Sequence, residues 1–349
     1  MNKILFGFAL LLSSLAFAET DHAFRDPRYT HLIHPLVSKT TDKGIAKNDV
    51  AAVIANQSSV KAQGARGTCS IFSSTAYLES LINNNLNLSE EWLEYTALRL
   101  KGMEGSDAPT NFDAIRNYGM PNEQSYPYIA EDWTKVFNPL QETRCGHILD
   151  LKQKKSCLIV HNDPALLSLR LVNDREFSRA KEEAFLFRDQ YLHFENTGYY
   201  RTSTNEIKRH LQKGSPIVLE MNFYLGAWNH READDYGIGR NIDHWNKGIV
   251  FTAEPGSVDL VESNKHMSGH SVLVVGYDDT VILTKTIKMT DGSLKTFSHK
   301  GVYYFKNSWG TDGFGKDFQI DGVNYPGYGM IVQKHANEQG AFFTLPALK

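Results

Sequence analysis

The sequence is poor in cysteine, in net charge and in long apolar runs. Only three of its 349 residues are cysteine, and 37 Lys and Arg nearly balance 40 Asp and Glu, which gives a formal net charge of −3. This balance gives no reason to expect a nucleic-acid or anionic-membrane partner. The sequence has no internal repeat and no low-complexity tract. Its length suits two modest lobes or one large domain.

The most apolar run of the chain lies at its start. Lys3 precedes an apolar stretch over residues 4–15, and Ala-Phe-Ala at residues 16–18 puts small side chains where a signal peptidase reads them. We therefore expect residues 1–18 to be a signal peptide that is cleaved before Glu19. The alternative is an N-terminal membrane anchor, but the run is shorter than the ~20 residues of a span. The prediction is an exported protein, periplasmic or extracellular, with no membrane span after signal removal.

The three cysteines are Cys69, Cys145 and Cys157. An odd number in an exported protein suggests one free thiol. Cys145 and Cys157 are twelve residues apart and are candidates for a disulfide in an oxidising compartment, the alternative being two unpaired thiols. If the disulfide forms, Cys69 is the free thiol.

Hydrophobic periodicity predicts helices in the first part of the chain and strands in the last part. The predicted helices cover residues 69–84, a segment that starts at 88–91 with Ser89 as its cap, and residues 111–118, 174–194 and 203–213. The predicted strands cover residues 217–221, 271–275, 281–289 and 301–305, with a hairpin at Asp291-Gly292. This order of elements indicates an α+β protein with two lobes.

Changes in composition suggest five parts. After the signal peptide we expect an N-terminal extension (19–50), a helical lobe with the nucleophile (51–134), an insertion (135–200) and a β-rich lobe (201–349). The insertion is set apart by its charged helical stretch and by a run of basic residues at 152–155.

Cys69 lies at the start of a predicted helix, after a segment with two glycines. A helix N-terminus carries partial positive charge and exposed N–H groups, which lower the pKa of a thiol and favour its reactive thiolate. Gln63 precedes Cys69 by six residues, across a turn. Its amide N–H and the backbone N–H of Cys69 would form an oxyanion hole. The alternatives are that Cys69 is only a structural cysteine and that Gln63 is a solvated glutamine in a turn.

A nucleophilic thiol needs a base, and His270 enters the apolar strand predicted at residues 271–275. Asn307 follows the strand at 301–305, and its side-chain oxygen would accept a hydrogen bond from the ring nitrogen turned away from sulfur. Trp309 would shield that bond from water. Taken one at a time, these residues have plainer interpretations. His270 is compatible with an incidental histidine at the start of a strand, and Asn307-Ser308 with an ordinary turn.

Three blocks together resemble the papain-like cysteine peptidase family, in that family's chain order. They are Gln63-Gly64 through Gly67-Thr68-Cys69, then Gly269-His270-Ser271-Val272, then Lys306-Asn307-Ser308-Trp309-Gly310. The resemblance implies a helical lobe and an antiparallel β-barrel-like lobe that face each other across a cleft. It implies a cysteine-type peptidase with the triad Cys69, His270 and Asn307, a protein or peptide substrate, and no cofactor or metal.

The resemblance also suggests which residues bind the substrate. Gly105 and Ser106 fall near the place where the family lines its cleft with glycines, and we assign Gly269 and Trp309 to the same surface. Some positions depart from the family pattern. Ser70 replaces a tryptophan, Arg66 replaces a cysteine, and Met103 lies roughly where the disulfide partner of that cysteine would be.

A second cluster has the residue types of a metal site: His230, Glu232, Asp234, Asp235 and His244. Its spacing matches no known motif, so we expect a polar loop and no metal.

Two other functions are compatible with these residues. One is a different acyl transfer on the same triad, such as a transpeptidase or an amidase. The other is an inactive relative that only binds protein or peptide, which the serine at position 70 keeps open. The sequence carries no signal for an oligomeric state.

Overall fold

The computed structural model describes residues 45–82, 85–99, 101–169 and 174–349. The predicted signal peptide and most of the predicted N-terminal extension lie outside this part of the chain. Within it, no helix combines the length and the apolar character that a membrane crossing requires.

Most helices lie in the first two thirds of the chain. They are α1 (Val50–Ala55), α2 (Cys69–Ile82), α3 (Glu90–Leu98), α4 (Ala108–Tyr118), α5 (Leu140–Cys145), α6 (Leu151–Val160), the 3-10 turn η2 (Leu166–Ser168), α7 (Arg175–Tyr191), α8 (Thr204–Gln212), α9 (Glu232–Asp235), α10 (Ile242–Asn246), α11 (Val258–Lys265) and α12 (Gln333–Gln339).

The strands follow, mostly after residue 200. They are β1 (Tyr200–Arg201), β2 (Ile217–Phe223), β3 (Ile249–Val250), β4 (Ser268–Lys288), β5 (Leu294–Lys306), β6 (Gln319–Ile320), β7 (Val323–Asn324), β8 (Tyr328–Val332) and β9 (Gly340–Thr344). Seven of them form one sheet in the order β1-β9-β2-β4-β5-β8-β3, and β6 pairs with β7.

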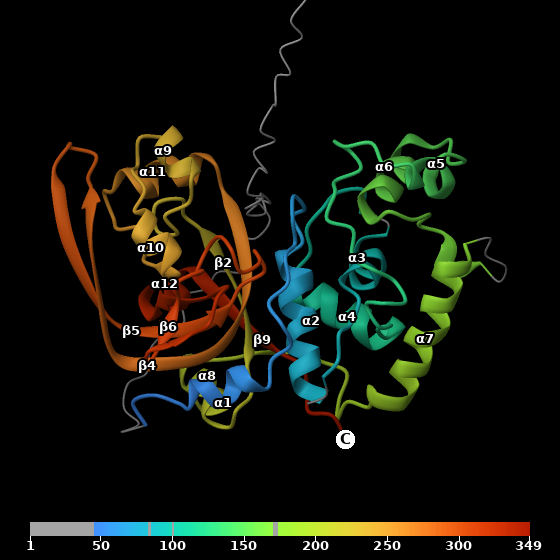
Figure 1. Cartoon of the computed structure of the whole chain (residues 1–349), viewed down its shortest axis with the longest axis horizontal. Coiled ribbons are helices and arrows are strands. Elements are labelled where there is room, and N and C mark those ends of the chain that lie inside the picture. Colours follow the sequence, from blue (N-terminus) through green and yellow to red (C-terminus); the bar gives the residue numbers. More distant parts are fainter. Residues whose placement is uncertain (1–44, 83–84, 100, 170–173) are drawn as a thin grey trace, which may run out of the picture.

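The predicted α+β fold with two lobes is confirmed (Figure 1). Helices α2 to α7 form one lobe, and the sheet with α8 to α12 forms the other. The β-rich lobe differs from the expected antiparallel barrel in two ways. The β3–β8 pair is parallel, so the sheet is mixed, and the pairing found among the described strands runs from β1 to β3 without closing into a barrel.

The predicted helix boundaries are largely confirmed, and local capping explains the differences. Helix α4 begins at Ala108 rather than at residue 111, because Asp107 accepts a hydrogen bond from the backbone N–H of Thr110 at 2.7 Å and acts as the N-cap. It ends at Tyr118 as predicted, and Gly119 follows as the C-cap residue with φ of 67°. Ser89 caps α3 as predicted, accepting from the backbone of the third residue beyond it.

The strands predicted at residues 271–275 and 281–289 are one strand, β4. Irregular pairing between Asp278 and Ile282 interrupts the register with β5, so the alternating pattern breaks although the strand continues. The predicted hairpin is confirmed: Lys288 pairs with Leu294, and Gly292 has φ of 83° in the turn.

The segment predicted as an insertion contributes to the main helical core. Helix α7 packs against α4, and α6 packs against α3. The ring of Phe177 in α7 lies 4.9 Å from that of Tyr95 and 5.4 Å from that of Trp92, between ring centroids. In Figure 1, α7 lies on the side of the helical lobe that faces away from the sheet.

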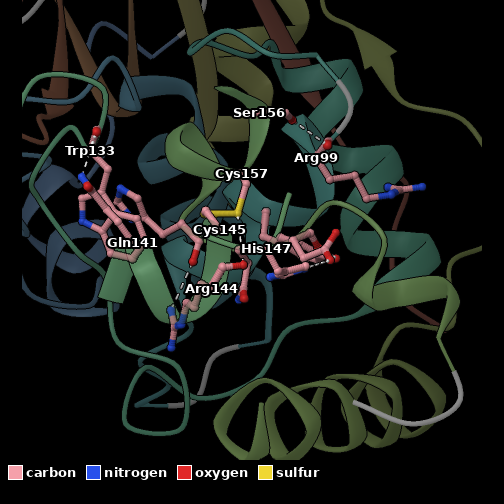
Figure 2. Close-up of a disulfide and its surroundings, with 12 residues drawn as sticks. Arg99, Trp133, Gln141, Arg144, Cys145, His147, Ser156 and Cys157 are labelled. Atoms are coloured by element: carbon pink, nitrogen blue, oxygen red, sulfur yellow. Dashed lines mark hydrogen bonds and ion pairs between the residues drawn. A yellow bond between two sulfur atoms is a disulfide. The ribbon is translucent and has the colours of Figure 1, made fainter. Parts of the chain in front are cut away.

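A disulfide joins Cys145, the last residue of α5, to Cys157 in α6 (Figure 2). Both sulfur atoms are buried against the ring of Trp133 and the side chain of Ile148 in a small apolar cluster. Cys69 is the free cysteine, and it is buried.

Candidate active site

Cys69 is the first residue of α2, the helix of the helical lobe that packs against β4 of the β-rich lobe (Figure 1). Its side chain is buried, with 3% of the residue exposed. One turn further along α2, Ser73 shares a 2.6 Å hydrogen bond between hydroxyl oxygens with Ser271 of β4. Because Ser271 follows His270 directly, this bond fixes the start of α2 beside the histidine.

His270 lies near the beginning of β4, and its ring is oriented by Asn307. The Nε2 atom of His270 is 2.8 Å from the Oδ1 atom of Asn307. An amide oxygen only accepts, so Nε2 carries the proton of the neutral ring and Nδ1 is left as the basic nitrogen. Nδ1 is buried and makes no hydrogen bond within the part of the chain that the structure describes.

Aromatic rings surround His270. The Trp309 ring is tilted against the imidazole, with centroids 4.5 Å apart and an interplanar angle of 31°. Trp228 meets it edge to face at 5.0 Å, and Phe223 does so at 6.0 Å. These rings exclude water from the bond between His270 and Asn307, which strengthens it.

Burial favours the neutral forms of both candidate catalytic groups. It raises the pKa of the Cys69 thiol to about 12, although the backbone N–H of Ser271 acts in the opposite direction. Burial likewise lowers the pKa of His270 to about 4, a shift that the bond to Asn307 partly offsets and the nearby His230 increases. The lowered thiol pKa expected from the helix N-terminus is therefore outweighed by desolvation.

These two shifts have one consequence for reactivity. A lone thiolate is disfavoured in this pocket, and so is a lone imidazolium. Transfer of the Cys69 proton to His270 creates both charges together, so that each stabilises the other.

Cys69 and His270 line one small pocket between the lobes. The residues that line it are Gly67, Cys69, Ser70, Ser106, Glu220, Gly269, His270 and Ser271. Ser106 and Gly269, both predicted to bind substrate, are among them. Gly105 precedes Ser106 but is not part of this lining, and Trp309 packs over the His270 ring instead of lining the pocket.

Gln63 is tied to the loop that carries Asn307. Its backbone N–H donates to the carbonyl oxygen of Ser308 at 2.8 Å, and its side-chain oxygen accepts from the Ser308 hydroxyl at 2.7 Å. Its amide nitrogen donates to the carbonyl oxygen of Arg66 at 2.7 Å. The orientation of the Gln63 amide is therefore fixed from both ends.

Arg66, at the position of the family's cysteine, is the centre of a buried ion-pair network. Its guanidinium contacts the carboxylates of Glu91 at 2.9 Å, Glu94, and Glu104 at 3.5 Å. Glu104 also accepts from the backbone N–H of Gly67 at 3.2 Å. Charge pairs thus hold the loop before Cys69 where the family pattern has a disulfide.

The loop considered as a metal site contains the short helices α9 and α10. Within the described residues, no three His, Cys, Asp or Glu side chains gather closely enough to hold a metal ion. The ring of His230 lies among aromatic rings, with centroids 5.6 Å from Phe223 and 6.0 Å from Trp245.

Sequence reasoning missed Glu220 and Trp228. Glu220 is a single carboxylate inside the apolar strand β2, and an isolated charge in a buried strand is the signal that would have identified it. Trp228 had no such signal, because only the fold brings its ring to the histidine.

Comparisons with known proteins agree with this geometry. The model of the papain family cysteine proteases matches residues 47–320, well over half of the chain, a range that includes Cys69, His270 and Asn307. An α+β fold of two lobes, with a cysteine and a histidine at their boundary, defines this class of protein. The chain belongs to the papain family of cysteine proteases.

Individual relatives match less of the chain. Cathepsin K of Gallus gallus is 34% identical over 85 residues, which are 23% of this chain and 25% of the relative. Pro-cathepsin H of Mus musculus is 39% identical over 89 residues, 24% of this chain and 27% of the relative. The matches thus span about a quarter of the length of these curated relatives.

One similar solved structure contains the cysteine protease and lectin-like domains of Cwp84, a surface layer associated protein of Clostridium difficile. It has a TM-score of 0.50 and 14% identity, over 94% of this chain and 60% of that one. This likeness concerns the fold.

Proposed function

We propose that this protein is a cysteine-type peptidase that hydrolyses peptide bonds through Cys69, His270 and Asn307. The observation that carries the proposal is the shared pocket of Cys69 and His270, with the histidine oriented by the 2.8 Å bond to Asn307. Because that bond engages Nε2, the basic Nδ1 is left to take the thiol proton.

The reaction follows from these roles. His270 Nδ1 takes the proton of Cys69, and the thiolate attacks the carbonyl carbon of the peptide bond. The amide N–H of Gln63 and the backbone N–H of Cys69 donate to the oxyanion. His270 then gives its proton to the leaving amine, the C–N bond breaks, and a thioester remains. Water, deprotonated by His270, attacks the thioester, releases the acid and restores the thiol.

We assign Gly105, Ser106, Gly269 and Trp309 to the substrate-binding surface, as the family resemblance implies. Two of them share the pocket with Cys69. The N-terminal extension (19–50) and the insertion (135–200) remain proposals for separate segments.

We further propose that the protein is exported to the periplasm or the exterior, as its N-terminal sequence suggests. The disulfide between Cys145 and Cys157 supports this, since such bonds persist in oxidising compartments and are rare in the cytosol.

The test compares the native protein with Cys69→Ala in the cleavage of an unfolded protein substrate. Cleavage is measured as the appearance of new α-amino groups. We expect cleavage by the native protein only. An added primary amine separates hydrolysis from acyl transfer, because a transferase would attach the amine to the new carboxyl end. Cleavage that persists in Cys69→Ala would contradict the assigned nucleophile, and no cleavage by either protein would favour a binding function.

A further inference from the structure

Glu220 is the acidic residue of β2, a strand whose other side chains are apolar or amide. It is 5% exposed. In the register of the sheet it lies opposite Ser271 of β4 on one side and Ala341 of β9 on the other. Its neighbour on the strand, Met221, lies opposite His270, so Glu220 is one register position away from the catalytic histidine.

The two oxygens of this carboxyl differ. Oε1 accepts a hydrogen bond from the backbone N–H of Ala108, the first residue of α4, at 2.7 Å. The side chain therefore bridges the two lobes. Oε2 is buried and has no hydrogen-bond partner anywhere in the described chain. A buried carboxyl oxygen without a partner is costly and rare, so it calls for a ligand group to explain it.

Glu220 lines the same pocket as Cys69 and His270. The hydroxyl of Ser106, in the same lining, is also buried without a partner among the described residues. Two unsatisfied oxygens thus lie in the pocket beside the nucleophile.

Among the described residues, the charged and titratable groups around Glu220 offer it no cation. Cys69 faces it from α2, His270 from β4, and Asp107 from the start of α4, while β9 contributes Ala341. The pKa of His270 is lowered to about 4, so this ring is neutral near pH 7. Burial, together with the negative charge of Asp107, raises the pKa of Glu220 to about 8.

We propose that Glu220 is a specificity-determining residue that accepts, through Oε2, the side chain of a Lys or Arg of the substrate next to the scissile bond. The inference rests on the proposed peptidase function. A cation is preferred to a neutral donor because it forms a charge-assisted bond and is attracted by two carboxyl groups, Glu220 and Asp107.

The proposal has a pH signature. The cation binds the ionised carboxylate, so its entry is linked to release of the Glu220 proton. The preference for a basic side chain therefore increases as the pH rises from 6 to 8.

The experiment uses pairs of peptides. One member of each pair carries arginine at a position next to the cleaved bond, and the other carries citrulline, the neutral isostere of arginine, at the same position. Positions on both sides of the cleaved bond are tested. The full chain and Glu220→Gln are assayed for kcat/KM. This substitution keeps an oxygen that accepts from Ala108, so the bridge between the lobes is retained. We expect the native protein to prefer arginine over citrulline at one position by about tenfold or more in kcat/KM. In Glu220→Gln we expect the ratio of the two kcat/KM values to fall close to one.

Glu254→Gln is the matched control. Glu254 is also buried in the β-rich lobe but does not line the pocket, and it pairs with Lys334 at 3.5 Å. We expect this variant to keep the arginine preference. If Glu220→Gln does not fold, the pH profile of the native protein decides, because a preference that is constant between pH 6 and 8 contradicts the proposal.

Equal cleavage of arginine and citrulline peptides by the native protein, lost in Cys69→Ala, would overturn this inference and leave the peptidase function standing. The same holds if Glu220→Gln keeps the full arginine preference. No thiol-dependent cleavage of any peptide would overturn both.

Discussion

Single buried residues decide the chemistry of this site. Desolvation raises the pKa of the Cys69 thiol to about 12 and lowers that of His270 to about 4, so neither group charges alone. Asn307 supports the imidazolium through its 2.8 Å bond, and the Trp309 ring keeps water away from that bond. Reactivity of Cys69 therefore requires a paired proton transfer to His270 rather than an independently acidic thiol.

Gln63, the proposed oxyanion donor, gives the first prediction. Gln63→Ala should lower kcat by about 10²–10³-fold, or about 2.7–4 kcal/mol of transition-state stabilisation, because one donor to the oxyanion is lost. KM should change little, since the donor acts mainly on the transition state. Steady-state kinetics on one peptide measures this, with Gln124→Ala, a surface change, as control. A variant that raises KM and keeps kcat would show that Gln63 binds substrate instead.

At the scale of elements, the sequence predicts what depends on local signals. Helix α2 begins at Cys69, and the Asp291-Gly292 turn closes the β4–β5 hairpin, because periodicity and turn chemistry are local properties. The residues of the proposed triad could be named from their motifs. Their orientation by aromatic rings such as Trp228 could not, since that depends on contacts between distant segments.

The charge pattern of residues 135–200 did not indicate how this segment packs. The exposed face of α7 is rich in charged residues, which suggested a separate insertion. Yet Phe177, Ala180 and Ala184, on its other face, are fully buried in the main helical core. An amphipathic helix of this kind reveals its partner only in the folded structure. Glu220 was missed for a similar reason, because it lies 151 positions after Cys69 in the sequence.

The network around Arg66 gives a prediction for the loop that precedes α2. Arg66→Ala should lower the free energy of unfolding by about 3–5 kcal/mol, because Glu94 is left buried without its cation and Glu91 keeps only its pair with His161. Urea unfolding measures the change. Lys247→Ala removes an exposed pair with Asp243 and should cost no more than about 0.5 kcal/mol. Equal losses in both variants would show that the buried network does not hold this loop.

At the scale of the whole molecule, the two lobes are joined by buried polar contacts. Glu220 of β2 accepts from Ala108 of α4, and Ser73 of α2 bonds to Ser271 of β4. The chain itself also crosses between the lobes: α1 packs on β4, and after β9 the backbone N–H of Leu345 donates to the hydroxyl of Tyr77 in α2. Titration of a bridging group should therefore affect global stability.

Glu220 sets the sign of that effect. Its pKa is about 8 in the folded protein against 4.5 ordinarily, so the folded state binds more protons between these values. The stability that this group contributes is complete below about pH 4.5 and is lost as the pH rises to about 8. We expect the difference in unfolding free energy between the native protein and Glu220→Gln to fall over this window. Urea midpoints at several pH values test it, with the exposed Glu338→Gln as control. A difference that stays constant or rises would contradict the assignment.

The pairing of Cys69 with His270 is the central claim, and alkylation of Cys69 as a function of pH tests it most directly. The protein and His270→Ala are labelled with iodoacetamide, and the extent is read by intact mass, which needs no knowledge of the substrate. We predict fast labelling of Cys69 well below pH 8, because the imidazole takes the thiol proton. This fast labelling should be lost in His270→Ala. Labelling only near or above the ordinary thiol pKa of about 8.5, unchanged by His270→Ala, would mean that the pair does not form.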